Sequence, residues 1–156
     1  MLDRAHALAL KTVGRLPARV RTFLVHRAAP SYSVGAMCVI VRDDGARLLV
    51  RHSYRKGWGV PGGLLKRGEE ASDGAVRETH EEVGLRVVLV GEPSVVIDPR
   101  PRRVDVIYLA RPAPGADTEA AEPSSPEVVE VRWFGKDEPL PPLQRESERA
   151  LDKVAR

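Results

Sequence analysis

Residues 63–85 of this 156-residue chain read GLLKRGEEASDGAVRETHEEVGL, and this stretch predicts the element around which the fold is built. Within it, Glu78, Glu81 and Glu82 are three and four residues apart, so one face of a helix would carry all three carboxylates. Like charges at this spacing destabilise a helix by roughly 0.2–0.5 kcal/mol per pair. Because hard cations such as Mg²⁺ are bound through carboxylate oxygens, the cluster points to a divalent metal site.

The neighbouring residues predict where this helix begins and ends. Glu69, Glu70 and Asp73 are placed where the helix dipole favours acids. Gly84 is suited to the left-handed conformation that ends many helices, whereas Gly74 would weaken the helix by about 1 kcal/mol relative to Ala. A narrow inner face of mostly small side chains, which would let the helix lie close to a sheet, consists of Ala71, Ala75, Thr79 and Val83.

The same stretch resembles the Nudix box. Gly63, five residues, Glu69, seven residues and then RETHEEVGL at 77–85 reproduce all seven invariant letters of that pattern. At ordinary residue frequencies, a chance match is on the order of 10⁻⁸ per starting position. Two positions depart from the pattern: Thr79 replaces a bulky aliphatic residue, and Lys66 stands where many members carry another acid.

The resemblance implies an α/β fold, namely an α/β/α sandwich with a mixed sheet. The box helix would cover one face of the sheet and a C-terminal helix the other. Residues 33–156 would form the hydrolase domain, and residues 1–32 would be an N-terminal helical extension.

The resemblance also implies an activity, the hydrolysis of a diphosphate linked to another group, with water attacking phosphorus. Mg²⁺, or Mn²⁺ in its place, would be held by Glu78, Glu81, Glu82, Gly63 and Glu127. Arg77 and Glu69 would orient these ligands. The catalytic residues would be Arg77 and the four glutamates that hold the metal, and the choice of general base stays open among Glu81, Glu82 and Glu127.

Basic residues suggest where the substrate phosphates would bind. Arg51, Arg55 and Lys56 lie in or beside a predicted loop, and Arg offers a two-pronged contact to phosphate oxygens. A second basic group, Arg100, Arg102 and Arg103, surrounds Pro101, a proline position that in the family is associated with ADP-ribose hydrolases.

These features favour ADP-ribose or a nucleotide sugar as the substrate. The alternatives are a pyrophosphohydrolase for normal or oxidised nucleoside triphosphates, a diphosphate isomerase, and a nucleotide- or RNA-binding module without activity. Cys38 on a predicted core strand argues against the isomerase, and the intact box argues against the silent module.

Composition sets broad bounds. The length suits one domain, and 42% apolar with 30% charged residues is ordinary for a globular protein. A net charge of +3 suits anionic partners. Cys38 is the only cysteine, so an intrachain disulfide is excluded and a cytoplasmic location is expected. No apolar run reaches 18 residues, so no membrane span is expected.

The N-terminal segment differs from the rest, because it contains no acid between Arg4 and Arg42. Apolar residues at helical spacing predict an amphipathic helix, which Gly14 and Pro17 would divide. That stripe comprises Leu2, Ala5, Ala9, Val13, Leu16 and Val20. We expect the helix to dock on the domain or on a second subunit of a homodimer. Binding to a membrane surface or nucleic acid, or a transit-type leader, is the alternative.

The remaining pattern predicts strands at residues 33–41, 47–51, 86–97, 103–110 and 128–134, and a final helix at 143–154. Residues 52–58 are predicted to be a loop and residues 61–63 a turn. The acidic, proline-rich residues 112–126 predict a mobile loop within the domain rather than a domain boundary.

Overall fold

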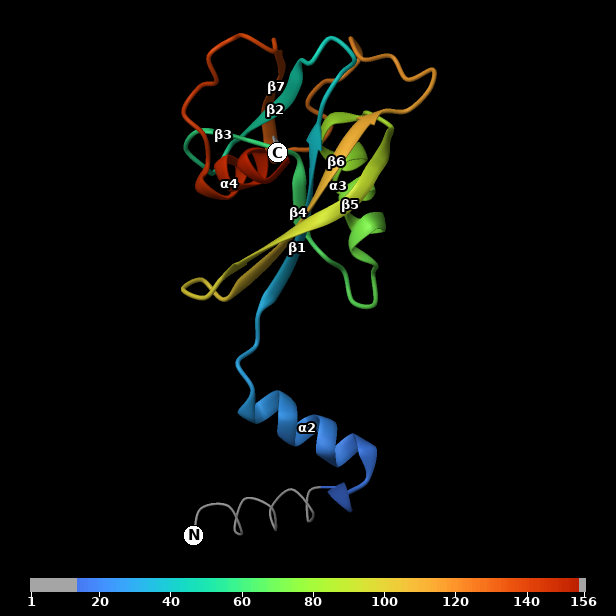
Figure 1. The fold of residues 1–156 in the computed structure, drawn as a ribbon, viewed down its shortest axis with the longest axis vertical. Coiled ribbons are helices and arrows are strands. Elements are labelled where there is room, and N and C mark those ends of the chain that lie inside the picture. Colours follow the sequence, from blue (N-terminus) through green and yellow to red (C-terminus); the bar gives the residue numbers. More distant parts are fainter. Residues whose placement is uncertain (1–13, 155–156) are drawn as a thin grey trace. The chain divides into compact units, whose positions relative to one another are not determined.

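The computed structural model describes residues 14–154, and the chain divides into two units that meet between Tyr32 and Ser33. The first unit contains helix α2, Ala18–Ala28, which begins directly after Pro17, where the sequence predicts a break (Figure 1). Its apolar side chains include several exposed ones: Val20, Phe23, Leu24 and Val25. Most of the predicted stripe (Leu2, Ala5, Ala9 and Val13) lies outside the described residues.

In its described residues, 33–154, the second unit contains two sheets and two helices (Figure 1). The four-stranded sheet has the order β4-β1-β6-β5, and the three-stranded sheet has the order β3-β2-β7. The strands are β1 (Ser33–Ile40), β2 (Arg47–His52), β3 (Trp58–Gly59), β4 (Gly62–Leu64), β5 (Val87–Asp98), β6 (Arg103–Pro112) and β7 (Val128–Phe134). The helices are α3 (Ala71–Val83) and α4 (Arg145–Val154).

The larger sheet is mixed, as the resemblance implies. Strand β1 runs parallel to β6 and antiparallel to β4, and β5 runs antiparallel to β6. Strand β6 is therefore central, with β1 and β5 as its neighbours, which explains its nearly continuous apolar sequence.

Helices α3 and α4 cover opposite faces of this sheet (Figure 1). Alternate residues of β1 point to opposite faces, as the two-residue period of a strand requires. Ala36, Cys38 and Ile40 pack in one cluster with residues of α3. Met37 and Val39 pack in the other cluster with residues of α4. The predicted α/β/α sandwich is confirmed. In residues 14–154, no helix is long and apolar enough to cross a membrane.

The predicted loop is present at residues 53–57, and two short strands follow it: β3 begins at Trp58, and β4 takes in Gly62 and Gly63 of the predicted turn. Strand β4 forms because glycines let backbones approach closely. A Cβ on Gly62, whose φ is 154°, would lie 2.5 Å from the carbonyl oxygen of Ala36. Its absence allows β4 to pair with β1 and brings Gly63 beneath helix α3. At Gly74 the neighbour is a side chain, because a Cβ there would lie 2.4 Å from Cδ2 of Leu65.

The acidic loop of residues 112–126 is tied to the end of α3. The backbone N–H groups of Glu122 and Ser124 donate to the carbonyls of Val83 and Glu82. The indole N–H of Trp133 donates to the carbonyl of Thr118 over 3.0 Å. The bonds from Glu122 and Ser124 satisfy carbonyls that the last turn of a helix leaves free, so this loop helps to fix the acidic end of α3.

Candidate active site

Arg77 lies at the centre of the acidic cluster. Its guanidinium donates to Glu69 over 2.6 and 2.8 Å, to Glu78 over 2.7 Å and to Glu81 over 2.9 Å. The hydrogen bonds from Arg77, together with one from the backbone N–H of Lys66, lower the pKa of Glu69 to about 2. In return, the hydrogen bond to Glu69 contributes most to a raised pKa of Arg77. Arg77 thus links the residues before the helix to two of its three clustered acids.

Glu82 is buried, with 5% of its surface exposed, and protein donors hold both of its oxygens. One oxygen is 3.1 Å from Nε2 of His52. The other accepts the backbone N–H of Gly62 over 3.1 Å. The carboxylate therefore has a fixed orientation between β2 and β4.

Glu78 lies against Gly63. A Cβ on Gly63 would be 2.5 Å from the carboxyl carbon of Glu78, so only glycine leaves room for this carboxylate. Burial raises the pKa of Glu78, and the charges of Glu82 and Glu81 add to this effect, while Arg77 opposes it. Glu78 is thus a partly desolvated acid close to a bare segment of backbone.

Glu81 has a different environment from the other two acids. Its side chain is 50% exposed and contacts Arg77 and, over 3.4 Å, the ammonium of Lys66. Partial desolvation raises its pKa, but the hydrogen bonds and charges of Arg77 and Lys66 outweigh this, and the net shift is downward. Glu81 also lines a separate hollow, beside His80 and Arg86.

A cleft of about 330 Å³ opens beside Glu78 and Glu82. Six residues that the sequence suggests for the site line it: Gly63, Glu78, Glu82, Arg55, Arg103 and Glu127. The cleft therefore joins the box helix to parts of the chain far from it, and carboxylates and arginines face the same space.

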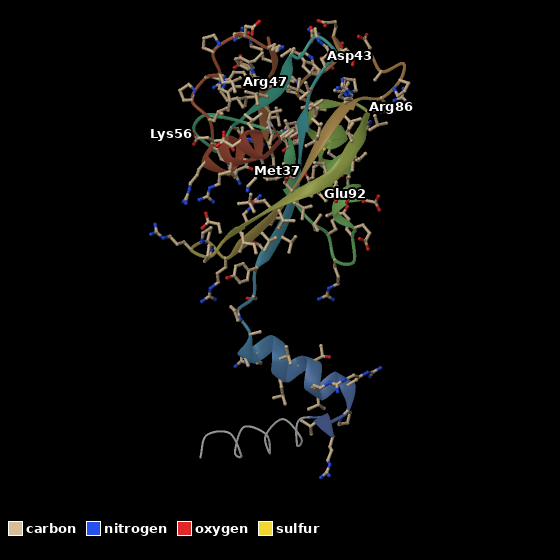
Figure 2. The ribbon with its side chains drawn as sticks, in the orientation of Figure 1. Met37, Asp43, Arg47, Lys56, Arg86 and Glu92 are labelled. Atoms are coloured by element: carbon tan, nitrogen blue, oxygen red, sulfur yellow. The ribbon has the colours of Figure 1, made fainter. Side chains whose placement is uncertain are left out.

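The other predicted phosphate-binding residues lie elsewhere. Arg51 pairs with Glu130 over 2.9 Å on the neighbouring strand. Lys56 is exposed at the periphery of the domain, away from the interior position of Met37, a residue of the cleft lining (Figure 2). Arg100 and Arg102 belong to the exposed turn between β5 and β6, where Arg102 has a φ of 52°. These four residues are not part of the cleft lining.

Several residues of the cleft lack a clear signal in the sequence. Gln144, Glu146 and Ser147 come from the start of α4, and Tyr54 donates a hydrogen bond to Glu127 over 3.2 Å. The sequence places His52 only at the start of a predicted loop, but it is 6% exposed and contacts Glu82. The alternation of β2 could have indicated it, because Leu48, Val50 and His52 share one face of the strand.

The residues present fit a magnesium ion. Within residues 14–154, no three His, Cys, Asp or Glu side chains form a ready-made cage for a metal. Mg²⁺ does not require one, because it usually keeps several waters and binds through one or two carboxylates and the substrate phosphates. Glu78 and Glu82 supply two carboxylates to the cleft. Because Gly63 has no Cβ, its backbone can lie close to the carboxylate of Glu78.

Fold and site together define an enzyme that acts on phosphate compounds, with acids on a helix and arginines across a polar cleft. The sequence matches the model of the NUDIX domain over residues 31–154. The chain belongs to the Nudix family, and it is a pyrophosphohydrolase that acts on phosphoric anhydrides.

Individual relatives agree with this assignment. A "MutT-like protein" of Streptomyces ambofaciens is 32% identical over 70% of this chain and 68% of its own length. A CMP-5'-(N-acetyl-N-hydroxy-3-aminopropyl)phosphonate hydrolase of Streptomyces rubellomurinus is 32% identical over 67% of this chain and 52% of its own length. The crystal structure of an ADP-ribose pyrophosphatase from Streptococcus suis has a TM-score of 0.60 and 27% identity, covering 81% of this chain and 93% of its own.

Proposed function

We propose that this enzyme hydrolyses a nucleoside diphosphate linked to a second group, with ADP-ribose or a nucleotide sugar as the substrate class. The observation that carries the proposal is the cleft itself, in which Glu78 and Glu82 face Arg55 and Arg103 across one polar space. A diphosphate can contact the arginines directly, and a cation between it and the acids balances their charges.

The chemistry requires this charge balance. Glu78, Glu82 and the backbone of Gly63 would hold Mg²⁺ or Mn²⁺. When bound, such an ion neutralises phosphate oxygens and lowers the pKa of a coordinated water. Arg77 and Glu69 hold the acid side in place through the hydrogen bonds described above. Arg103, which donates to Asp105 over 2.6 Å, presents an anchored guanidinium to the substrate.

The general base is best assigned to Glu127. This residue is exposed, lines the cleft, and accepts a hydrogen bond from the neutral hydroxyl of Tyr54. Glu81 is held by two cations and lines another hollow, and both oxygens of Glu82 accept protein hydrogen bonds. Glu127 is therefore the carboxylate among the three that is most free to accept a proton from water.

A smaller hollow next to the cleft, distinct from the one beside Glu81, supports a substrate in which a second group is attached to the nucleoside diphosphate. It has a volume of about 230 Å³, and it shares Arg103 and Glu146 with the cleft. Pro101 lines it, together with Arg145 and Arg149, which both contact Asp98. We assign this hollow to the group attached to the nucleoside diphosphate, because arginines there can bind a sugar hydroxyl or a terminal phosphate.

The names of two similar proteins support this substrate class. One is a hydrolase of a CMP-linked phosphonate and the other an ADP-ribose pyrophosphatase, so each name describes a nucleotide joined to a second group. The isomerase alternative is disfavoured, because Cys38 is buried in β1 and burial raises the pKa of its thiol to about 11.

A substrate panel tests the proposal. ADP-ribose, nucleotide sugars, nucleoside triphosphates and oxidised triphosphates would be incubated with the protein and Mg²⁺, Mn²⁺ or EDTA, and the products separated by ion exchange. We expect ADP-ribose or a nucleotide sugar to show the highest kcat/KM, with a nucleoside monophosphate as product and no turnover in EDTA. A higher kcat/KM for a triphosphate, with release of pyrophosphate, would establish the alternative function.

A further inference from the structure

Three buried polar side chains form a continuous row from the start of α4 to the acid of α3. Gln144, His52 and Glu82 are 7%, 6% and 5% exposed, respectively. Nε2 of Gln144 is 3.3 Å from Nδ1 of His52, and Nε2 of His52 is 3.1 Å from Oε1 of Glu82. Buried polar groups at such separations are normally hydrogen-bonded, and their geometry limits which atom carries each proton.

The neighbours of Gln144 determine the direction of its amide. Its Nε2 also lies 3.3 Å from the carbonyl oxygen of Gly57, which can only accept. Its Oε1 lies 3.4 Å from Nη1 of Arg55, which can only donate. The amide NH₂ group therefore faces His52 as a donor.

This direction fixes the tautomer of His52. Because Nδ1 accepts from Gln144, the imidazole carries its proton on Nε2 and donates that proton to Glu82. Backbone bonds keep Gln144 in place, since its own N–H donates to the carbonyl of Trp58 over 2.7 Å and Trp58 donates to Pro142 over 2.9 Å.

The carboxylate of Glu82 is thus held by one donor on each oxygen, His52 on one side and the N–H of Gly62 on the other. An ionised carboxylate has about four lone-pair sites, so roughly two remain for another ligand. A carboxylate fixed in this way does not need to be oriented when a cation or a substrate binds.

We infer that His52 is a positioning residue for this reaction. Its hydrogen bond orients the carboxylate of Glu82 toward the cleft, and Gln144, just before α4, holds the imidazole of His52 in place. The inference rests on the proposed function, because it assigns His52 a purpose only if Glu82 binds the cation.

Two substitutions separate positioning from packing. His52→Leu fills much of the imidazole volume but cannot donate, whereas His52→Gln retains an N–H group near the place of Nε2. His80→Leu is the matched control, because His80 is an exposed histidine on the same helix as Glu82. Binding of Mn²⁺ to the full-length protein without substrate would be measured by electron paramagnetic resonance, and kcat, KM and Tm would be measured in parallel.

We expect His52→Leu to weaken Mn²⁺ binding and lower kcat by about 10–100-fold with KM little changed, as is common for residues that orient metal ligands. His52→Gln should recover most of this loss, and His80→Leu should match the parent protein. The inference is overturned if His52→Leu binds Mn²⁺ as the parent does, or if the Leu and Gln variants are equally impaired. If the parent itself binds no Mn²⁺, both the metal site and the role of His52 are wrong.

Discussion

The two sides of the cleft are built in different ways. The acidic side comes from one stretch of sequence, with Glu78 and Glu82 on α3 packed against Gly62 and Gly63 of β4. The opposite side is assembled from distant segments, with Arg55 after β2, Arg103 at the start of β6 and Glu127 before β7. The acidic side is close-packed and tolerates little change, whereas the basic side consists of longer side chains on segment ends. Substitutions around the clustered acids should therefore mainly lower kcat, whereas substitutions of the arginines on the opposite side should mainly raise KM.

Among changes that leave the acids themselves in place, the largest effect is expected for Gly63→Ala. The new Cβ would lie 2.5–2.7 Å from the carboxylate of Glu78 and displace it. A displacement of about 1 Å can cost about 100-fold in rate, so we expect kcat to fall by about that factor. Gly135→Ala is the control, because its Cβ would have no neighbour closer than 3.8 Å. Equal rates for both variants would mean that the position of Glu78 does not limit the reaction.

On the basic side, Arg103→Lys should mainly raise KM. Lys keeps a cation beside the buried Asp105 but loses the two-pronged contact to phosphate oxygens. We expect KM to increase about tenfold, equivalent to about 1.4 kcal/mol of binding energy. Arg51→Lys, which changes an arginine outside the cleft lining, should leave KM unchanged. Similar KM values for the two variants would remove Arg103 from the substrate site.

The support of the acidic side should be visible in the pH dependence of stability. The pKa of Glu69 falls from its ordinary value of 4.5 to about 2 in the folded protein, so the unfolded chain binds this proton first as pH decreases. The stabilisation is complete above pH 4.5 and is lost as the pH falls through about 2.

Glu69→Gln should therefore make the free energy of unfolding less dependent on pH in this range, as measured by urea titrations in EDTA. Glu92→Gln is the control, because it removes one negative charge from an exposed position on β5; its free energy of unfolding should depend on pH as that of the parent does. An unchanged slope in Glu69→Gln would contradict the ion pair with Arg77.

The smallest effect on catalysis is expected from removal of the N-terminal segment. We propose a domain boundary near Ser33, because the cleft is lined by residues from Met37 onward. A chain that starts at Ala29 should keep its fold and a kcat within about twofold of the parent. It should lose a subunit contact or an affinity for anionic surfaces, which light scattering and anionic-liposome sedimentation would distinguish.

High salt provides the further test, because screening weakens attraction between exposed charges but leaves apolar contacts almost unchanged. An insoluble or unfolded truncated protein would place residues 1–32 in the core of the domain.

The sequence predicted the acidic side well because its information is local. The periodicity of residues 71–83 and the glycine after them correspond closely to helix α3, in which Gly84 has a φ of 67° and ends the helix. Apolar residues likewise indicated most strands, including the central strand β6, where they are nearly continuous.

The remaining features depend on pairs of residues that are distant in sequence. His52 meets Glu82 across 30 positions and Gln144 across 92, and no local pattern indicates such contacts. Strand β4 was missed because glycines give no strand signal, although here they permit the approach of β1. Arg51 and Arg55 have the same chemistry in the sequence, yet of the two only Arg55 lines the cleft, where it pairs with Glu146, whereas Arg51 pairs with Glu130 on the neighbouring strand β7.

The central claim is that carboxylates which face the cleft bind the cation and support hydrolysis. Its most direct test is a comparison of kcat for Glu82→Gln and Glu81→Gln at saturating Mg²⁺, with both variants confirmed to be folded. The amide keeps the shape of Glu82 but loses its charge. Several kcal/mol of stabilisation by the metal should be lost, which corresponds to at least about a 10³-fold decrease in kcat. Glu81→Gln, at the partly exposed position outside the cleft, should lose much less. A folded Glu82→Gln protein with the kcat of the parent would contradict the account.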